Sequence, residues 1–399
     1  MENENIKIWW QRLKLNDLGF IGRWKSKHRP RDDKSLFWWD YPFIQTADVK
    51  HVELYITKYN ETYSEKWLQQ SKLWKKWTLC ITIAANISES GILMFDACFP
   101  DSIVWFIADE EKSNTKYVKY LLDTLKLHFQ QISKWTTQDN LSLDKLLSID
   151  FLVPPLDIQN KIADALSAYD DLIENNNRRI QILEQTAQEV YKEWFVNFKF
   201  PWYETIKIID SETDFWIIPE WWNIENLWDR IKILKWKNIT KSTITPWDIP
   251  VIAWWISPAY YHNKPNVNWP VITISASGAN AGYIRLYYQD IWASDCSYIS
   301  KDNSKFIYYY FLLLKDKQIN ITNLQVGSAQ PHVYPKDIIS FKVIIPNNDI
   351  IADFETKITP IFHELSNLEN QNNNLIKTRD LLLPKLISWE IDVSELEII

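Results

Sequence analysis

"IQNKIADALSAYDDLIENNNRRIQILEQTAQEVYKEW" spans Ile158–Trp194, and apolar residues recur along it in steps of three or four. This spacing places them in one narrow stripe along a helix, which we call the seam. Two apolar residues per heptad are typical of a coiled coil. Only Asn176 interrupts this seam, and an asparagine there would fix the register of the pairing at some loss of stability. The seam residues are Ile158, Ile162, Leu166, Tyr169, Ile173, Ile180, Leu183, Ala187, Val190 and Trp194.

A second seam lies near the C-terminal end of the chain and is broken by Asn372 and Arg379. Since neither helix can bury its seam alone, we expect the segments Ile158–Lys199 and Ile351–Ser388 to pair with each other. The alternative is that each is an ordinary amphipathic helix lying on a core. The second seam consists of Ile351, Phe354, Ile358, Ile361, Leu365, Leu368, Leu375, Leu382 and Leu386.

The segments before the helices form an internal repeat. "CITIAANISESGIL" (Cys80–Leu93) matches "VITISASGANAGYI" (Val271–Ile284) at an offset of 191, and Gln138 falls on Gln330 at an offset of 192. Short apolar runs set off by turn residues predict β-rich folding in both copies. A repeat this long indicates two related domains rather than a solenoid.

The predicted fold class is therefore α+β, with two β-rich domains separated by two long helices. A pseudo-two-fold axis relating the copies would make the helices pair as an antiparallel coiled coil. The predicted division is a first β-rich domain at 1–155, a central spacer helix at 156–200, a second β-rich domain at 201–348, and a C-terminal helix and tail at 349–399.

Composition limits the class of protein. Of the 399 residues, 46% are hydrophobic, which supports real cores, and no run of 18 apolar residues predicts a membrane span. The three cysteines form no CxxC pair, which fits a reducing cytoplasm and argues against a zinc site. The N-terminal segment is polar and acidic, unlike a signal peptide. We therefore expect a cytoplasmic protein without a bound metal. The net charge of −7 argues mildly against nucleic-acid binding, although the local field matters more than the sum.

The balance of glycine and tryptophan is unusual. The chain has 6 Gly and 23 Trp, whereas average usage predicts about 28 Gly. Many tryptophans stand in turn contexts, where glycine is favoured. Both facts follow if the organism reads the codon UGA as glycine and the sequence was written with a translation table that reads UGA as tryptophan. The alternative is a genuinely Trp-rich protein. The 18 positions assigned to glycine are Trp9, Trp24, Trp38, Trp39, Trp67, Trp77, Trp105, Trp135, Trp202, Trp216, Trp221, Trp228, Trp236, Trp247, Trp254, Trp255, Trp269 and Trp389.

Enzymatic motifs are weak. With glycine at Trp24, the stretch Gly19–Ser26 fits the P-loop pattern, but no helix pattern follows it. Pro100–Asp101 with Glu110 and Lys112 resembles a PD…ExK nuclease site, yet Glu110 and Lys112 fall in an expected turn. "VPPL" (Val153–Leu156) is interpreted as a strand end before a helix. A stand-alone DNA nuclease or a P-loop NTPase remains the alternative function, and no catalytic set is assigned.

Polar and basic segments instead predict a DNA-binding surface. "RWKSKHRPR" gathers cations suited to phosphate contacts. Gln45, Thr46 and Asp48 at the end of an expected strand, small polar loops in equivalent places of both copies, and aromatic and polar residues of the second copy suit base-edge contacts. The alternative for the basic segment is a solvated loop. The candidate residues are Arg23, Lys25, Lys27, His28, Arg29, Arg31, Gln45, Thr46, Asp48, Asn86, Gln138, Asn140, Tyr260, Tyr261, Asn263, Lys264, Ser277, Asn280, Gln330 and His332.

Taken over essentially its whole length, the chain resembles the specificity subunit of type I restriction–modification enzymes. "DDLIENNNRRIQILEQTAQEVYKEWFVNF" resembles the central spacer helix of that family, "IPEWWNIENLWD" the start of a second target-recognition domain, and "LLLPKLISWEIDVSELEI" the usual C-terminus. Most departures place Trp where the family pattern has glycine, as in "ISWEID".

The resemblance implies a non-catalytic subunit that recognises a bipartite double-stranded DNA target. It implies methyltransferase subunits docked along the helices and an ATP-driven restriction and translocase subunit as partners. It further implies no cofactor in this chain, with S-adenosylmethionine, ATP and Mg²⁺ belonging to the partners.

Overall fold

A computed structural model describes residues 10–24, 37–50, 52–68, 71–83, 89–132, 142–210, 217–253, 258–327 and 331–395. The chain divides into two compact units. Unit 1 comprises residues 1–175 and 372–399, and unit 2 comprises residues 176–371. Each unit therefore holds one β-rich part and a segment of each long helix. None of the helices in the described part of the chain is long and apolar enough to cross a membrane.

The β-rich part of unit 1 is built on a five-stranded sheet of order β2-β8-β6-β7-β4. Helix α5 (Thr115–Ile132) packs against it, contacting β7. A separate two-stranded sheet pairs β1 with β9, and β9 lies immediately before the first long helix in sequence. The strands of the β-rich part are β1 (Gln11–Leu13), β2 (Gly19–Arg23), β3 (Phe37–Phe43), β4 (Tyr55–Ile56), β5 (Glu61–Tyr63), β6 (Leu79–Thr82), β7 (Ser90–Leu93), β8 (Ile103–Ala108) and β9 (Phe151–Val153), and its short helices are α2 (Leu15–Leu18), α3 (Thr46–Val49), α4 (Glu65–Leu68) and α6 (Leu143–Leu147).

Unit 2 repeats this plan around the sheet β16-β15-β18, with β12 pairing β19 before the second long helix. A further sheet has the order β14-β13-β17. The strands are β10 (Ile208–Asp210), β11 (Ile217–Pro219), β12 (Asn223–Asn226), β13 (Ile249–Ile252), β14 (Tyr260–His262), β15 (Val271–Ser275), β16 (Ile284–Tyr287), β17 (Trp292–Ala293), β18 (Cys296–Ser300) and β19 (Lys342–Ile345), and the helices are α8 (Ile307–Asp316), α9 (Gln318–Thr322) and α10 (Pro335–Ile339).

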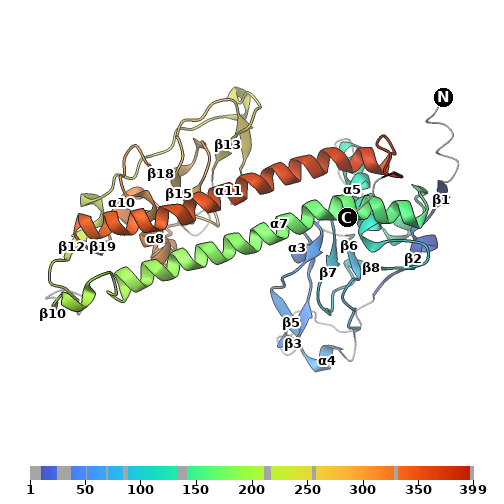
Figure 1. Cartoon of the computed structure of the whole chain (residues 1–399), viewed down its shortest axis with the longest axis horizontal. Coiled ribbons are helices and arrows are strands. Elements are labelled where there is room, and N and C mark those ends of the chain that lie inside the picture. Colours follow the sequence, from blue (N-terminus) through green and yellow to red (C-terminus); the bar gives the residue numbers. More distant parts are fainter. Residues whose placement is uncertain are drawn as a thin grey trace. The chain divides into compact units, whose positions relative to one another are not determined.

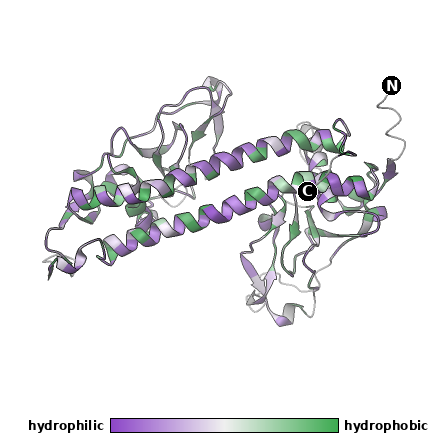
Figure 2. Ribbon diagram, viewed as in Figure 1, coloured by the Kyte–Doolittle hydropathy of each residue, from purple (hydrophilic) through white to green (hydrophobic). Residues whose placement is uncertain are grey.

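The long helices confirm the predicted seams. They are α7 (Leu156–Tyr191), continued by a π-helical turn at Lys192–Val196, and α11 (Asn348–Ile387). In each unit a segment of α7 packs beside a segment of α11 in the opposite direction (Figure 1). Hydrophilic and hydrophobic residues alternate along both helices (Figure 2), as a narrow apolar stripe requires.

Contacts within the units fix the antiparallel direction. In unit 2, the ring of Trp194 lies 5.4 Å from that of Phe354, and Arg179 donates to Glu364 at 2.6 Å. In unit 1, Asp170 on α7 pairs with Arg379 on α11. Later residues of α7 therefore lie against earlier residues of α11, so the two helices are antiparallel. These segments also pack on the sheets, because Leu166 and Leu386 belong to the core of unit 1 while Tyr191 and Phe354 belong to the core of unit 2.

The repeat extends to helix positions. Helices α5, α6 and α7 begin at Thr115, Leu143 and Leu156, and their counterparts α8, α10 and α11 begin at Ile307, Pro335 and Asn348, each 192 residues later. The predicted internal repeat is thus confirmed by the order and spacing of the elements.

The free backbone N–H groups at the N-termini of the equivalent helices α5 and α8 donate hydrogen bonds to different residues. Asn114 Oδ1 accepts from the N–H groups of Lys116 and Tyr117 at α5, and Asn114 N donates to Gln159 of α7. At α8 the carboxylate of Glu355 on α11 accepts from Tyr308 N and Tyr309 N at 3.0 and 2.9 Å. In both copies a long helix therefore contributes to capping the helix that packs on the sheet.

Candidate DNA interface

In unit 2, strand β14 presents Tyr260 and Tyr261, both exposed, and Asn263 and Lys264 follow in an exposed loop. Within the described part of the chain the strand pairs only with β13 and forms an edge of its sheet, with Val251 opposite Tyr260. Two aromatic rings beside an amide and an ammonium group offer stacking and hydrogen-bonding surfaces to a polar partner.

A second group of candidates meets where two loops of unit 2 come together. Ser277 and His332 form an isolated antiparallel β-bridge. Gly278 N donates to Pro331 O at 2.9 Å, and Val333 N donates to Ala276 O at 3.0 Å. Gly278 has φ 78°, a conformation that favours glycine. Ser277, Asn280 and His332 are therefore brought into one loop cluster, whereas Gln330 lies outside the described residues.

Asp295 joins this loop cluster to the β13 sheet. Ser277 Oγ donates to the Asp295 carboxylate at 2.5 Å, and Ala276 N donates to Asp295 O at 3.3 Å. The next residue back, Ser294, donates its N–H to Ile252 O at the end of β13 at 2.7 Å. The loop cluster and the β13–β14 strands are thus tied by one continuous hydrogen-bond path within unit 2.

In unit 1, Gln45 and Thr46 lie at the start of α3, with Gln45 as the N-cap residue. The Asp48 carboxylate accepts from Gln45 N at 2.7 Å and from Asn60 Nδ2 at 2.6 Å, while Gln45 Nε2 donates to Glu61 at 2.6 Å. The Asp48 carboxylate therefore stabilises the turn at the start of α3, and the hydrogen bond to Glu61 fixes the orientation of the Gln45 side-chain amide.

Most of the predicted basic segment lies outside the described residues. Arg23 is described: it ends β2, and its Nε donates to the carbonyl of Asp101. The candidates outside the described residues in unit 1 are Lys25, Lys27, His28, Arg29, Arg31, Asn86, Gln138 and Asn140.

The two register asparagines lie where the seams predict. Asn176 and Asn372 are both buried, and Asn176 Nδ2 donates to Gln371 Oε1 at 3.4 Å. A polar side chain held in a buried seam favours one alignment of the two helices over alternatives.

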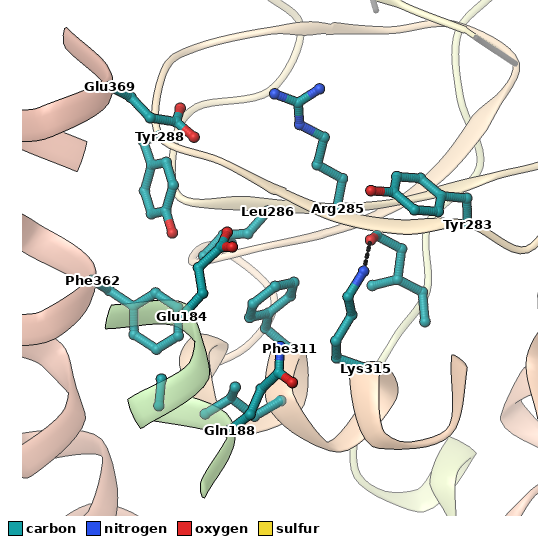
Figure 3. Close-up of a pocket in the computed structure, with 13 residues that line it drawn as sticks. Glu184, Gln188, Tyr283, Arg285, Leu286, Tyr288, Phe311, Lys315, Phe362 and Glu369 are labelled. Atoms are coloured by element: carbon teal, nitrogen blue, oxygen red, sulfur yellow. Dashed lines mark hydrogen bonds between the residues drawn. The ribbon is translucent and has the colours of Figure 1, made fainter. Parts of the chain in front are cut away.

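A pocket of about 250 Å³ lies in unit 2 where α7, α11, α8 and β16 meet. Figure 3 shows Glu184 and Glu369 facing it from the two long helices, with Arg285 and Lys315 on the opposite side. Lys315 Nζ donates to Ile284 O at 3.0 Å. Burial raises the pKa of both carboxyls and lowers the pKa of Lys315. Charges of opposite sign from the helices and the β-rich part meet here, which suits a structural junction.

The described residues of the enzyme-like motifs lie in ordinary strands, turns and helix starts. Gly19–Arg23 forms strand β2 rather than a phosphate-binding loop. Glu110 and Lys112 lie in the turn after β8, where Lys112 pairs with Asp109 at 2.9 Å. "VPPL" is the end of β9 and the start of α7, as predicted. Across the described residues, no group of three or more His, Cys, Asp or Glu side chains is placed to hold a metal ion.

Sequence reasoning missed two residues of the unit 2 loop cluster. Asp295 orients Ser277, and Tyr334 stacks on His332 with ring centroids 6.0 Å apart. Asp295 has φ 51°, and aspartate tolerates this region better than most residues. An aspartate directly before a strand, and an aromatic residue two positions after a histidine, are signals too weak to identify either from sequence.

Comparison with known proteins identifies the family. The family model described as "Type I restriction modification DNA specificity domain" matches residues 8–185 and again residues 225–378. The chain is 26% identical to the type I restriction enzyme MjaIX specificity subunit of Methanocaldococcus jannaschii, over 97% of this chain and 94% of that protein. It is 22% identical to the HindI specificity subunit of Haemophilus influenzae, over 69% of this chain and 74% of that protein.

A solved structure shares the fold. The S subunit of a type I restriction–modification system from M. genitalium superposes with a TM-score of 0.57 at 15% identity, covering 94% of this chain and 96% of that chain. The family model matches the chain twice, once in each copy of the repeat, and covers well over half of its residues. The chain therefore belongs to the family of type I restriction–modification DNA specificity subunits.

Proposed function

We propose that this chain reads a bipartite DNA target, with the β-rich part of each unit recognising one half. The observation that carries the proposal is the duplication: equivalent helices begin 192 residues apart, and the DNA specificity family model matches each copy. Two related binding parts in one chain suit two short recognition sites in one duplex, because each part presents its loops from an equivalent scaffold.

The chemistry of the unit 2 candidates supports direct contact with bases. Asn263 and Asn280 carry amide groups that donate and accept, as base edges in the major groove require. Tyr260 and Tyr261 add exposed aromatic surface on a paired strand rather than on a free loop. The basic segment of unit 1, including Lys25, supplies the charge that phosphate contacts need.

The helices set the distance between the two half-sites in this account. The 36 residues of α7 correspond to roughly 54 Å of helix at 1.5 Å per residue. We assign the binding of methyltransferase subunits to the faces of these helices that point away from the seams. S-adenosylmethionine, ATP and Mg²⁺ then act in the methyltransferase and restriction subunits, in the cytoplasm, and this chain contributes recognition alone.

The test is a domain exchange in the assembled methyltransferase complex. Residues 201–348 are replaced by the corresponding segment of a specificity subunit with a different known target, and methylated sites are mapped across a genome. We expect one half of the target to change while the other half stays the same. A change in both halves, or in neither, would contradict the proposal.

A second assay separates this function from the enzymatic alternatives. The purified chain alone is incubated with DNA, ATP and Mg²⁺. We expect neither cleavage nor ATP hydrolysis, because Glu110 and Lys112 lie in a turn and Gly19–Arg23 forms a strand. Turnover that is lost on changing Asp101 or Lys112 would instead favour a nuclease.

A further inference from the structure

We propose that the natural protein carries glycine at the 18 tryptophan positions named in the sequence analysis above. The backbone supplies evidence independent of composition. Among the described residues, five that are not glycine have positive φ: Trp77, Phe198, Trp202, Asp295 and Trp389. Three of these five are tryptophan, and all three belong to the 18. A side chain with a Cβ is strained in this region, whereas glycine adopts it freely.

Trp389 occupies the glycine position of a helix C-terminal motif. It follows α11, with φ 61°. Glu390 N donates to Lys385 O at 2.8 Å, and Trp389 N donates to Leu386 O at 3.3 Å. These are the two bonds of a Schellman motif, whose left-handed residue is usually glycine. Here that residue is Trp389.

Trp202 occupies the glycine position of a type II turn. Tyr203 N donates to Phe200 O at 3.0 Å and closes a turn with Pro201 as its second residue and Trp202 as its third. Trp202 has φ 69° and ψ 11°. Proline at the second position and glycine at the third are the preferred residues of this turn. The Trp202 side chain is 69% exposed, so no core contact favours the indole there.

Trp77 repeats the pattern in unit 1. Thr78 N donates to Lys75 O at 3.1 Å, which makes Trp77 the third residue of a turn, and its φ is 74°. The turn leads directly into β6, and the indole is again exposed. Three separate turns thus place an indole where the backbone favours glycine.

Most of the tryptophans that we retain are buried. Of the five that we retain, Trp10, Trp74, Trp194 and Trp222 are buried, and the half-buried Trp292 donates its Nε1–H to Lys237 O at 2.9 Å. None of these five has positive φ.

Of the nine reassigned residues whose side chains are described, four are exposed and one is buried. Trp77, Trp202, Trp221 and Trp247 are exposed, and Trp389 is buried against Trp10. The remaining reassigned residues whose side chains are described are half-buried: Trp24, Trp105, Trp236 and Trp269.

Exposed indoles ordinarily suggest a docking surface for another protein. That explanation does not account for the backbone, because a docking residue has no need of a left-handed conformation. A UGA codon read as glycine in the organism and written as tryptophan accounts for conformation and exposure together. The exposed indole of Trp202 therefore does not define a partner site.

Peptide mass spectrometry of the protein isolated from its own organism tests the proposal directly. We expect the residue mass of glycine at positions 77, 202 and 389, and the residue mass of tryptophan at positions 74 and 222 in the same digest. An indole mass at position 202 or 389 would overturn the proposal.

Thermal unfolding of the chain as written provides a second, independent readout. Trp77→Gly and Trp202→Gly should each raise Tm by roughly 2–4 °C, because the left-handed strain is relieved. Trp74→Gly and Trp222→Gly are matched controls that delete buried rings and should lower Tm by about 10 °C. If the two turn variants lower Tm as the two core variants do, the indoles are native and the proposal is wrong.

Discussion

Arg379 of α11 pairs with Asp170 of α7 inside unit 1, at the point where both helices lie against the β-rich part. Arg379 also contacts Glu53 at 2.6 Å, and Tyr120 of α5 donates its hydroxyl to Asp170. The arginine that breaks the apolar seam is therefore the centre of a buried polar network. It ties the helix pair to the β-rich part with directional bonds that apolar packing lacks.

Removing one partner of this network should strongly destabilise unit 1. Arg379→Met leaves the buried Asp170 carboxylate without its counter-charge, and we expect a loss of about 3–5 kcal/mol in the free energy of unfolding. The double variant Arg379→Met with Asp170→Leu should recover most of that loss. Arg179→Met, which breaks the exposed pair with Glu364, is the control and should change stability by less than about 1 kcal/mol. Urea denaturation of all four chains measures the effects, and equal losses for both single variants would contradict a buried network.

The Glu355 carboxyl should make the stability of unit 2 depend on pH. Burial raises its pKa to about 7, although the N–H groups of Tyr308 and Tyr309 act in the opposite direction. Because the folded-state pKa lies above the unfolded value of 4.5, the contribution of this group to stability is full below pH 4.5 and is lost as pH rises through 7. The shift corresponds to about 3 kcal/mol.

Glu355→Gln tests this assignment. The variant should flatten the stability profile between pH 4.5 and 7, since glutamine does not titrate. Thr356→Ala, at an exposed position of the same helix, removes no titratable group and should leave the profile as it is in the parent chain. Guanidinium unfolding at half-unit pH steps provides the measurement, and a profile unchanged by Glu355→Gln would mean that another group titrates.

Tyr260 and Tyr261 should contribute to one half-site only. Changing both to alanine should weaken binding of the methyltransferase complex to its target by about 1–3 kcal/mol, the range for loss of a base contact. Discrimination should fall at the bases read by unit 2, while those read by unit 1 stay fixed. Tyr203→Ala removes an equally exposed ring elsewhere in unit 2 and serves as the control. Competition binding with single-base variants of the target measures both, and an equal loss for Tyr203→Ala would argue against this surface.

The basic segment should act on all sequences alike. Changing Lys25, Lys27 and Arg29 to alanine should weaken binding to specific and unrelated DNA and reduce the salt slope by up to about 3, because each phosphate contact releases about 0.9 counterion. Gln45→Ala should instead alter base preference in one half-site without changing the slope. Lys112→Ala, at a cation paired with Asp109, is the control. Binding titrations at several salt concentrations measure the slope, and an unchanged slope in the triple variant would place this segment away from DNA.

The helices and the repeat could be predicted because their signals are local and long. Apolar spacing alone located α7 and α11 to within a few residues, except that α7 ends at Tyr191 and a π-helical turn replaces its last predicted turn. Arg379 was visible as a break in the seam. Its partner Asp170 was not predictable, because the two residues are 209 positions apart in sequence and meet only through the antiparallel pairing.

The candidate site was predictable in residue type but not in geometry. The small polar loop around Ser277 stood out by its counterpart in the first copy. Its contacts with His332 and Asp295 depend on strand order, which one sequence does not reveal. Gln45 was expected at a strand end, and the helix α3 that begins beside it is only four residues long, too short for a periodic signal.

A paired heptad deletion tests most directly whether the helices set the distance between two recognition sites. Removing residues 171–177 and 370–376 keeps both seams in phase and spares Asp170, Arg379, Glu184 and Glu369. It shortens each helix by about 10 Å, which corresponds to up to about three base pairs at 3.4 Å each. Methylation mapping of the assembled complex should then find the same two half-site sequences separated by a shorter unread spacer. An unchanged spacer, or altered bases in either half-site, would contradict the account.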